Sequence, residues 1–109
     1  MIQYIFGGRG RGKTTSLVQI SCETGSPIVT SSEVSARRIL ESSANLDAEL
    51  PRVYTLREVL SGKLRGTHVK EILLDDAELV IDAALKAYLG VPVKMAAIGE
   101  RSKQLTLNE

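Results

Sequence analysis

Glycines and a Lys-Thr pair near the start of the chain have the spacing needed to hold a phosphate group. The stretch FGGRGRGKTT covers residues 6–15. It fits the pattern G-x-x-x-x-G-K-T through Gly7, Gly12, Lys13 and Thr14. Glycine permits backbone angles that turn several amide N–H groups toward one anion, and a helix starting after the loop adds partial positive charge. The pattern predicts a nucleotide-phosphate site rather than a flexible basic tail.

The side chains of this glycine-rich loop have separate expected roles. The Lys13 ammonium can reach the β- and γ-phosphates as a point charge, and the Thr14 hydroxyl can ligate Mg²⁺. Arg9 and Arg11 either add positive charge near the phosphates or point into solvent from a surface loop. The expected nucleotide-binding residues are Gly7, Gly8, Arg9, Gly10, Arg11, Gly12, Lys13, Thr14 and Thr15.

Two acids at the end of an apolar run supply a possible partner for this loop. The stretch EILLDD occupies residues 71–76 and ends in Asp75 and Asp76. An acid at the end of a buried strand can hold Mg²⁺ through water, opposite Lys13 and Thr14. We therefore assign Asp75 to the metal site together with Thr14.

Hydrolysis of a bound nucleotide would also need a base that orients water beside the γ-phosphate. Asp76 is the first candidate, followed by Glu100 and then Glu78. The alternative for Asp76 is that it caps the helix that follows it. Lys13, Asp76 and Glu100 are thus the expected catalytic residues.

Short apolar runs alternate with helical patterns along the chain, and this alternation predicts the elements that position these residues. Strands are expected at residues 2–6, 27–30, 52–55, 71–76 and 93–98. Helices are expected at residues 14–23, 32–43, 56–62 and 77–89. Such alternation is typical of a single three-layer α/β/α domain with a five-stranded, mainly parallel sheet. Ligands of such sheets bind at the carboxyl ends of the strands, where both motifs fall.

Several local signals refine these boundaries. Thr55 and Glu58 have capping-box spacing before the third helix, and Gly90 is expected to end the fourth. On that fourth helix the expected apolar contacts come from Leu79, Ile81, Leu85 and Leu89. The domain is expected to cover residues 1–100, and the polar residues 101–109 are expected to form a fraying tail.

Composition limits the classes of function. The chain has 109 residues, 43% hydrophobic and 25% charged, with a net charge of +1, which fits one globular domain without a bulk attraction for nucleic acid or membranes. A single cysteine, Cys22, excludes an internal disulfide and a multi-cysteine zinc site. No apolar run is long enough to span a membrane, and no signal peptide is visible. We expect a cytoplasmic protein.

GGRGRGKT and ILLDD resemble the Walker A and Walker B motifs of P-loop NTPases. The order of elements over residues 1–100 is similar to that of the first RecA-like motor domain of superfamily-1 helicases. There the fourth strand carries Asp-Glu-Ala-Gln, for which this chain has Asp75-Asp76-Ala77-Glu78, and the fifth ends in Gly-Asp, for which it has Gly99-Glu100. The resemblance implies a P-loop NTPase fold with ATP and Mg²⁺ as ligands. In size the chain is similar to small ATP-binding proteins of bacteriophages.

Two differences from that family lower the ATPase activity that we expect. Asp76 stands where the family has its catalytic Glu and is one methylene shorter, and misplacement of that order can cost about a hundredfold in rate. The chain has no counterpart of the second motor domain, which supplies arginine fingers. We therefore expect a slow ATPase that needs a partner or self-association for full activity. The arginines that a neighbouring copy could supply are Arg9, Arg11, Arg37, Arg38 and Arg101.

Other interpretations stay open. One is a nucleotide-gated adaptor with little or no hydrolysis. Another is a helicase-like fragment, in which Arg37 and Arg38 approach single-stranded nucleic acid unless they simply line a solvated helix face. A third is a thymidine-kinase-like protein, although its zinc-binding cysteines have no counterpart. The chain has no N-K-x-D stretch for guanine, so ATP is expected rather than GTP.

Overall fold

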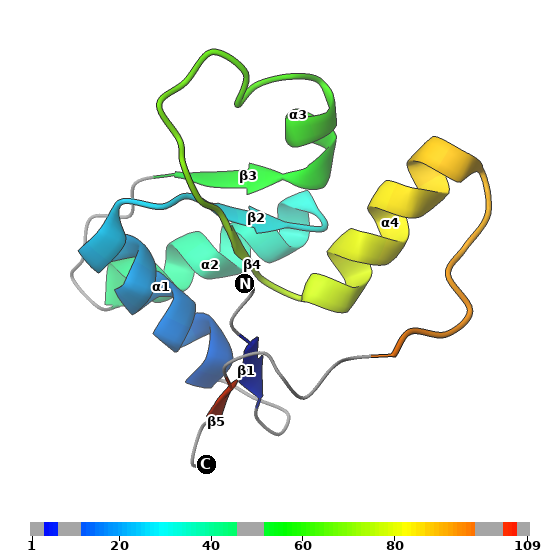
Figure 1. The fold of residues 1–109 in the computed structure, drawn as a ribbon. Coiled ribbons are helices and arrows are strands. Elements are labelled where there is room, and N and C mark those ends of the chain that lie inside the picture. The colour runs from blue at the N-terminus through cyan, green and yellow to red at the C-terminus, as the bar shows by residue number, and fades with distance from the viewer. Residues whose placement is uncertain (1–3, 7–11, 46–51, 98–103, 107–109) are drawn as a thin grey trace.

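A computed structural model describes residues 4–6, 12–45, 52–97 and 104–106 (Figure 1). Helices and short strands alternate along these ranges. The strands are β1 (Tyr4–Phe6), β2 (Ile28–Thr30), β3 (Val53–Thr55), β4 (Leu73–Leu74) and β5 (Gln104–Thr106). The helices are α1 (Gly12–Thr24), α2 (Glu33–Asn45), α3 (Leu56–Leu60) and α4 (Ala77–Leu89). No helix in the described ranges is both long and apolar enough to cross a bilayer.

The centre of the fold is a three-stranded parallel sheet with the order β3-β2-β4. β2 lies in the middle, and its residues form two rows across the sheet. The first row contains Ile28, Val53 and Leu73, and the second contains Val29, Tyr54 and Leu74. Because successive side chains of a strand point to opposite faces, these two rows supply the two apolar faces of the sheet.

Helices cover both faces, so the predicted α/β architecture is confirmed for this small sheet. On one face Val18 of α1, Ile28 of β2 and Ile39 of α2 form a buried cluster. On the other face the buried residues come from β2, β3, α3 and α4: Val29, Tyr54, Leu56 and Val80. Ile28 and Val18 are completely buried and Val29 is 1% exposed, so β2 is the element that both clusters share.

Helix α3 begins where the sequence places it. The Thr55 hydroxyl accepts a hydrogen bond from the Glu58 backbone N–H at 3.2 Å, and Glu58 Oε1 accepts one from the Thr55 N–H at 3.0 Å. This is the predicted capping box, in which two backbone donors at the helix start are satisfied reciprocally. The helix is shorter than expected because its C-cap is Ser61 and Gly62 already lies outside it.

Helix α4 packs through a different face from the predicted one. Val80 is buried, and Ala83 and Ala84 pack against the same cluster as it does. The large apolar residues expected to make the contacts are exposed instead: Leu79, Ile81, Leu85 and Leu89. The small alanines allow the helix to lie close to the sheet, and the bulkier side chains are left on the outer surface. Tyr88 is 87% exposed on the same helix.

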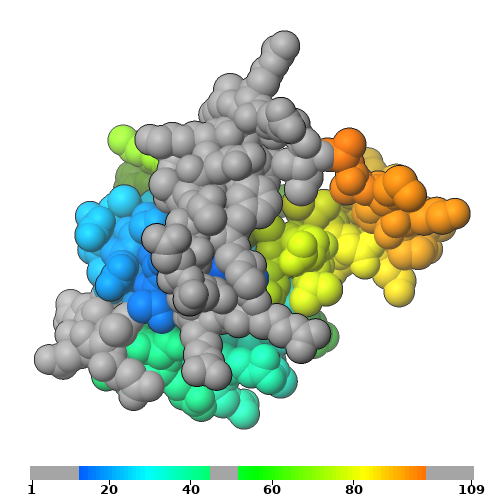
Figure 2. Space-filling view, turned by 90° about the horizontal axis from the view of Figure 1, so that it is seen from below, coloured from blue at the N-terminus to red at the C-terminus, as the bar shows by residue number. Residues whose placement is uncertain are grey.

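The segment after α4 does not form the expected strand at residues 93–98. Residues 93–97 carry no regular secondary structure, and residue 98 lies outside the described ranges. The backbone N–H of Val93, which a strand would use in its ladder, donates instead to Asp82 Oδ1 at 2.7 Å. Met95 is 83% exposed, so this segment does not bury its largest apolar side chain in a sheet. Figure 2 shows the segment, in orange, projecting from the molecule beside α4.

The fifth strand comes from the part of the chain expected to be a fraying tail. β5 pairs in parallel with β1, with Tyr4 opposite Gln104 and Phe6 opposite Thr106. Within the described residues β1 and β5 form a two-stranded sheet separate from the three-stranded one. The single five-stranded sheet of the prediction is therefore replaced, over the described residues, by two smaller parallel sheets.

The burial of Ile28 and the exposure of Tyr88 predict different losses of stability when each side chain is replaced by alanine. Ile28→Ala should cost about 2–5 kcal/mol of unfolding free energy, because it opens a cavity between the central strand and two helices. Tyr88→Ala should change stability by no more than about 0.5 kcal/mol, because the ring is exposed. Urea unfolding followed by circular dichroism measures both. A large loss for Tyr88→Ala would mean that the outer face of α4 is covered in the isolated chain.

Candidate functional site

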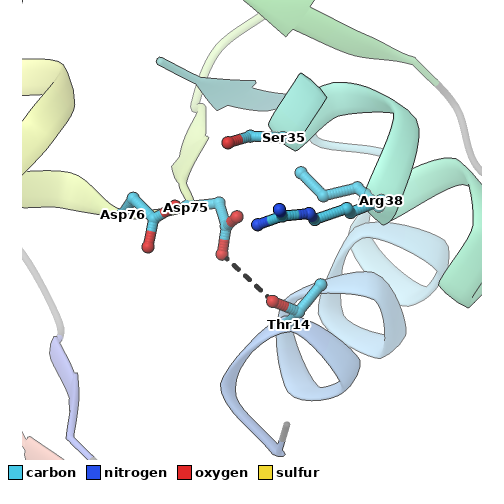
Figure 3. A pocket seen from close by; sticks show the side chains of 6 residues that line it. Thr14, Ser35, Arg38, Asp75 and Asp76 are labelled. Carbon is cyan, nitrogen blue, oxygen red and sulfur yellow. Dashed lines mark hydrogen bonds between the residues drawn. The ribbon is translucent and has the colours of Figure 1, made fainter. Parts of the chain in front are cut away.

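A pocket of about 220 Å³ lies where three elements meet (Figure 3). The first turn of α1, the residues that follow β4 and the first two turns of α2 form its walls. The lining residues are Thr14, Ser35, Arg38, Ile39, Asp75 and Asp76. All but Ile39 are polar or charged. Because Asp75 and Asp76 directly follow β4, the pocket lies at the carboxyl end of a parallel strand. This is the position where ligands of α/β sheets bind.

The α1 wall comes from the glycine-rich motif. α1 begins at Gly12, so Lys13 and Thr14 lie in its first turn, where backbone N–H groups have no partner within the helix. These donors and the helix dipole favour an anion at this end of the pocket. Thr15 follows on the same turn and is half-buried. The remaining predicted nucleotide-binding residues lie outside the described ranges: Gly7, Gly8, Arg9, Gly10 and Arg11.

The structure brings together Thr14 and Asp75, the two residues predicted to share a metal ion. The Thr14 hydroxyl donates a hydrogen bond to Asp75 Oδ1 at 3.4 Å, although the residues are 61 positions apart in sequence. β4 carries Asp75 to this place because it pairs with β2, and the Asp75 N–H donates to the Val29 carbonyl at 3.0 Å. The contact thus joins the first turn of α1 to the central sheet.

Asp75 is a buried carboxylate with poor compensation for its charge. Its side chain is 9% exposed, and it forms no ion pair with any described residue. Burial raises the pKa of Asp75 above its ordinary value of 3.8, and the neighbouring Asp76 raises it further. The Thr14 hydrogen bond and the charge of Lys13 act in the opposite direction. On balance the pKa is raised, because burial and the charge of Asp76 outweigh these two contributions.

This imbalance makes the residues a fit for a divalent cation. A buried carboxylate is costly unless a cation or hydrogen bonds offset its charge. Mg²⁺ prefers oxygen ligands at about 2.0–2.1 Å in an octahedron, which places adjacent ligand atoms about 2.9 Å apart. The 3.4 Å separation of the Thr14 and Asp75 oxygens is slightly wider, and suits direct ligation by Thr14 with Asp75 acting through water.

The described residues alone would not enclose such an ion. The described residues contain no cluster of three or more His, Cys, Asp or Glu side chains placed to hold a metal. Mg²⁺ in proteins commonly takes only one or two protein ligands and completes its shell with water and substrate phosphates. The pair formed by Thr14 and Asp75 therefore suits an ion that arrives with a phosphate ligand.

Asp76 lies at the N-cap of α4 but does not cap it with its side chain. Its backbone is left-handed, with φ 52° and ψ 55°, and no side-chain hydrogen bond reaches the helix. It is the one non-glycine among the described residues with positive φ. Left-handed backbone in a residue with a Cβ is unfavourable and concentrates at functional sites. Asp76 is exposed, and its carboxylate forms no capping hydrogen bond to α4. The carboxylate lies beside Asp75 at the pocket (Figure 3).

The other two candidate bases are not in the pocket lining. Glu78 is exposed in the first turn of α4, where its charge complements the helix dipole. Glu100 lies outside the described residues, so its predicted role stays a prediction. Within the described part of the chain, Asp76 is the candidate base that the structure brings to the site.

Ser35 and Arg38 belong to the pocket but were not assigned to it from the sequence. The Ser32 hydroxyl accepts a hydrogen bond from the Ser35 N–H at 3.2 Å, which fixes the start of α2 at residue 33. Ser35 and Arg38 are three positions apart and so share one side of the helix. The sequence signal was their position in the helix after β2, whose carboxyl end faces the site. Figure 3 shows the Arg38 side chain extended toward Asp75.

Searches against protein-family models, curated proteins and solved structures return no match to the chain. The chemistry of the pocket is therefore inferred from its own residues and their geometry.

The raised pKa of Asp75 predicts that its negative charge destabilises the ligand-free fold. In Asp75→Asn this charge is absent, so at pH 7 without metal or nucleotide the variant should be more stable than wild type by about 1 kcal/mol. For a domain of this size that corresponds to a midpoint of thermal unfolding higher by about 4–8 °C. Thermal unfolding followed by circular dichroism at several pH values measures the difference.

The pH dependence supplies the check. A carboxyl whose pKa is raised by folding contributes stability below its ordinary value of 3.8 and loses it as pH rises through the raised pKa. The gap between Asp75→Asn and wild type should therefore be smallest near pH 4 and widen toward neutrality. Glu78→Gln, at an exposed acid on α4, is the matched control and should show little change. A gap that is constant with pH would contradict this account of Asp75.

Proposed function

We propose that the chain is a Mg²⁺-dependent nucleoside-triphosphate-binding protein, with ATP as the expected nucleotide, that hydrolyses it slowly on its own. The observation that carries this proposal is the contact between Thr14 and the buried Asp75 in the lining of a polar pocket. The two residues come from separate sequence motifs, and the acid-ended apolar run gains its magnesium interpretation from the glycine-rich motif that precedes it. The proposed fold around them is that of a P-loop NTPase.

Each residue of the site has a defined task under this proposal. Lys13 neutralises charge on the β- and γ-phosphates, and the backbone N–H groups at the start of α1 donate to phosphate oxygens. Thr14 would ligate the ion and Asp75 would hold it through water. When bound, Mg²⁺ would offset the phosphate charge and the buried charge of Asp75.

Asp76 is the proposed base that orients the attacking water. Its carboxylate lines the pocket next to Asp75 and is not engaged at the helix N-terminus. An aspartate side chain is one methylene shorter than the catalytic glutamate of the superfamily-1 helicases that the sequence resembles. We therefore expect slow turnover. Sustained turnover by the isolated chain faster than about 1 per second would contradict this expectation.

A second candidate function is a nucleotide-gated adaptor that binds ATP and hydrolyses little of it. The specific observation in its favour is that α4 starts directly after Asp76 and exposes Ile81, Leu85 and Tyr88. Contiguous exposed apolar surface of this kind marks interaction sites. A change in the backbone of Asp76 on nucleotide binding would act directly on the helix that carries this surface.

Phosphate release and nucleotide binding, measured together, test the proposal. With Mg²⁺ and ATP, Lys13→Ala should lose both binding and release, because it removes the cation that faces the phosphates. Asp76→Asn should retain binding and lose release by about a hundredfold, the usual contribution of a positioned base. A malachite-green assay measures release, and the shift of the thermal midpoint on addition of MgATP measures binding.

Glu78→Gln is the matched control, since it neutralises an acid two residues away that does not line the pocket. It should retain both activities. Loss of release in Glu78→Gln but not in Asp76→Asn would assign the base to Glu78. Binding without release in the wild-type chain would favour the adaptor, and no binding of any nucleoside triphosphate would refute the proposed function.

A further inference from the structure

Arg38 is a cation in the pocket lining that has no role in the function proposed above. It lies in the second turn of α2 and lines the same pocket as Thr14, Asp75 and Asp76. Its side chain extends toward Asp75 from the wall opposite Asp76 (Figure 3). Arg38 forms no ion pair with any described residue. The described part of the chain therefore leaves the guanidinium donors of Arg38 for a ligand.

The charges around the pocket favour a contact between Arg38 and a phosphate group. Asp75 and Asp76 contribute two carboxylates, and a divalent ion at Asp75 would offset both. A nucleoside triphosphate brought by that ion carries further negative charge on its terminal phosphate. Lys13 approaches this region from α1, close enough to lower the pKa of Asp75. Arg38 is the cation on the α2 side, so a terminal phosphate beside Thr14 would lie between positive groups from two helices.

Ser35 adds a second polar group to the α2 side of the pocket, next to Arg38. The Ser32 hydroxyl donates to Ser35 Oγ at 3.2 Å. A serine hydroxyl can donate one hydrogen bond and accept two, so this contact leaves Ser35 Oγ with capacity for a further hydrogen bond. Ser35 lines the pocket one turn before Arg38. A hydroxyl and a guanidinium on one helix face form a donor surface suited to phosphate oxygens.

We propose that Arg38 binds the terminal phosphate of a nucleoside triphosphate in the same chain, and that this contact makes the site prefer triphosphates to diphosphates. The inference rests on the proposed function. It differs from the sequence-based expectation that a second copy or a partner supplies the missing arginine. Guanidinium is suited to this role because its fixed donors can bind two phosphate oxygens at once.

The adjacent arginine provides a matched control. Arg37 is also exposed on α2 but does not line the pocket. If both arginines served a general basic surface, such as one for nucleic acid, replacing either would have a similar and nucleotide-independent effect. A phosphate contact predicts instead that only Arg38 affects nucleotide binding, and only for the triphosphate.

Equilibrium binding of fluorescent ATP and ADP analogues in Mg²⁺ tests the inference. The variants are Arg38→Ala, Arg38→Lys, Arg37→Ala and Lys13→Ala. Arg38→Ala should weaken ATP binding about tenfold or more, the usual effect of losing a charge-assisted hydrogen bond, and change ADP binding less than twofold. Arg38→Lys should lie between wild type and Arg38→Ala. Arg37→Ala should match wild type for both nucleotides.

The outcomes separate the inference from the proposed function. If wild type binds ATP, Lys13→Ala does not, and Arg38→Ala binds ATP as wild type does, the inference is overturned and the proposed function stands. Equal weakening of ATP and ADP in Arg38→Ala also overturns it, because the contact is then not with the terminal phosphate. If wild type binds neither nucleotide, both fail. Circular dichroism without nucleotide establishes folding, and Arg38→Lys decides the question if Arg38→Ala is unfolded.

Discussion

The site depends on one constraint, the placement of a buried carboxylate that has no ion pair with any described residue. Asp75 is 9% exposed, lies beside a second aspartate, and accepts a long hydrogen bond from the Thr14 hydroxyl. In a ligand-free chain such a group costs folding free energy. That cost is tolerable only if the rest of the domain is stable enough to hold it. Under the proposed function, the same imbalance would favour the binding of a divalent cation beside Asp75.

The central strand provides the stability that this arrangement needs. β2 fills both apolar clusters and pairs with β3 on one side and β4 on the other. β4 has only two residues in the ladder, so its position is set largely by β2, including the hydrogen bond from the Asp75 N–H to the Val29 carbonyl. The site is thus built on the most buried element of the fold, which is the arrangement expected where charged groups must be held in a fixed geometry.

Sequence reasoning succeeded where the signal was local. The Thr55–Glu58 capping box depends on two residues three positions apart, and the start of α3 was predicted from it. The meeting of Thr14 with Asp75 was predicted because each belongs to a motif with its own chemistry. Predictions that needed tertiary information were less accurate. α4 is apolar on several sides, so its pattern could not show that Ala83 and Ala84 face the sheet, and Arg38 carries no motif that distinguishes it from Arg37.

The pairing of β1 with β5 has a consequence for when the site can form during synthesis. β1 is made before the glycine-rich loop that follows it in the sequence, while its partner β5 lies roughly one hundred residues later. Closing so long a loop carries an entropic cost that local contacts do not. The three-stranded sheet can assemble from residues 28–74 before β5 has been made. In a nascent chain the acidic residues after β4 would therefore be held in place well before β1 gains its neighbour β5.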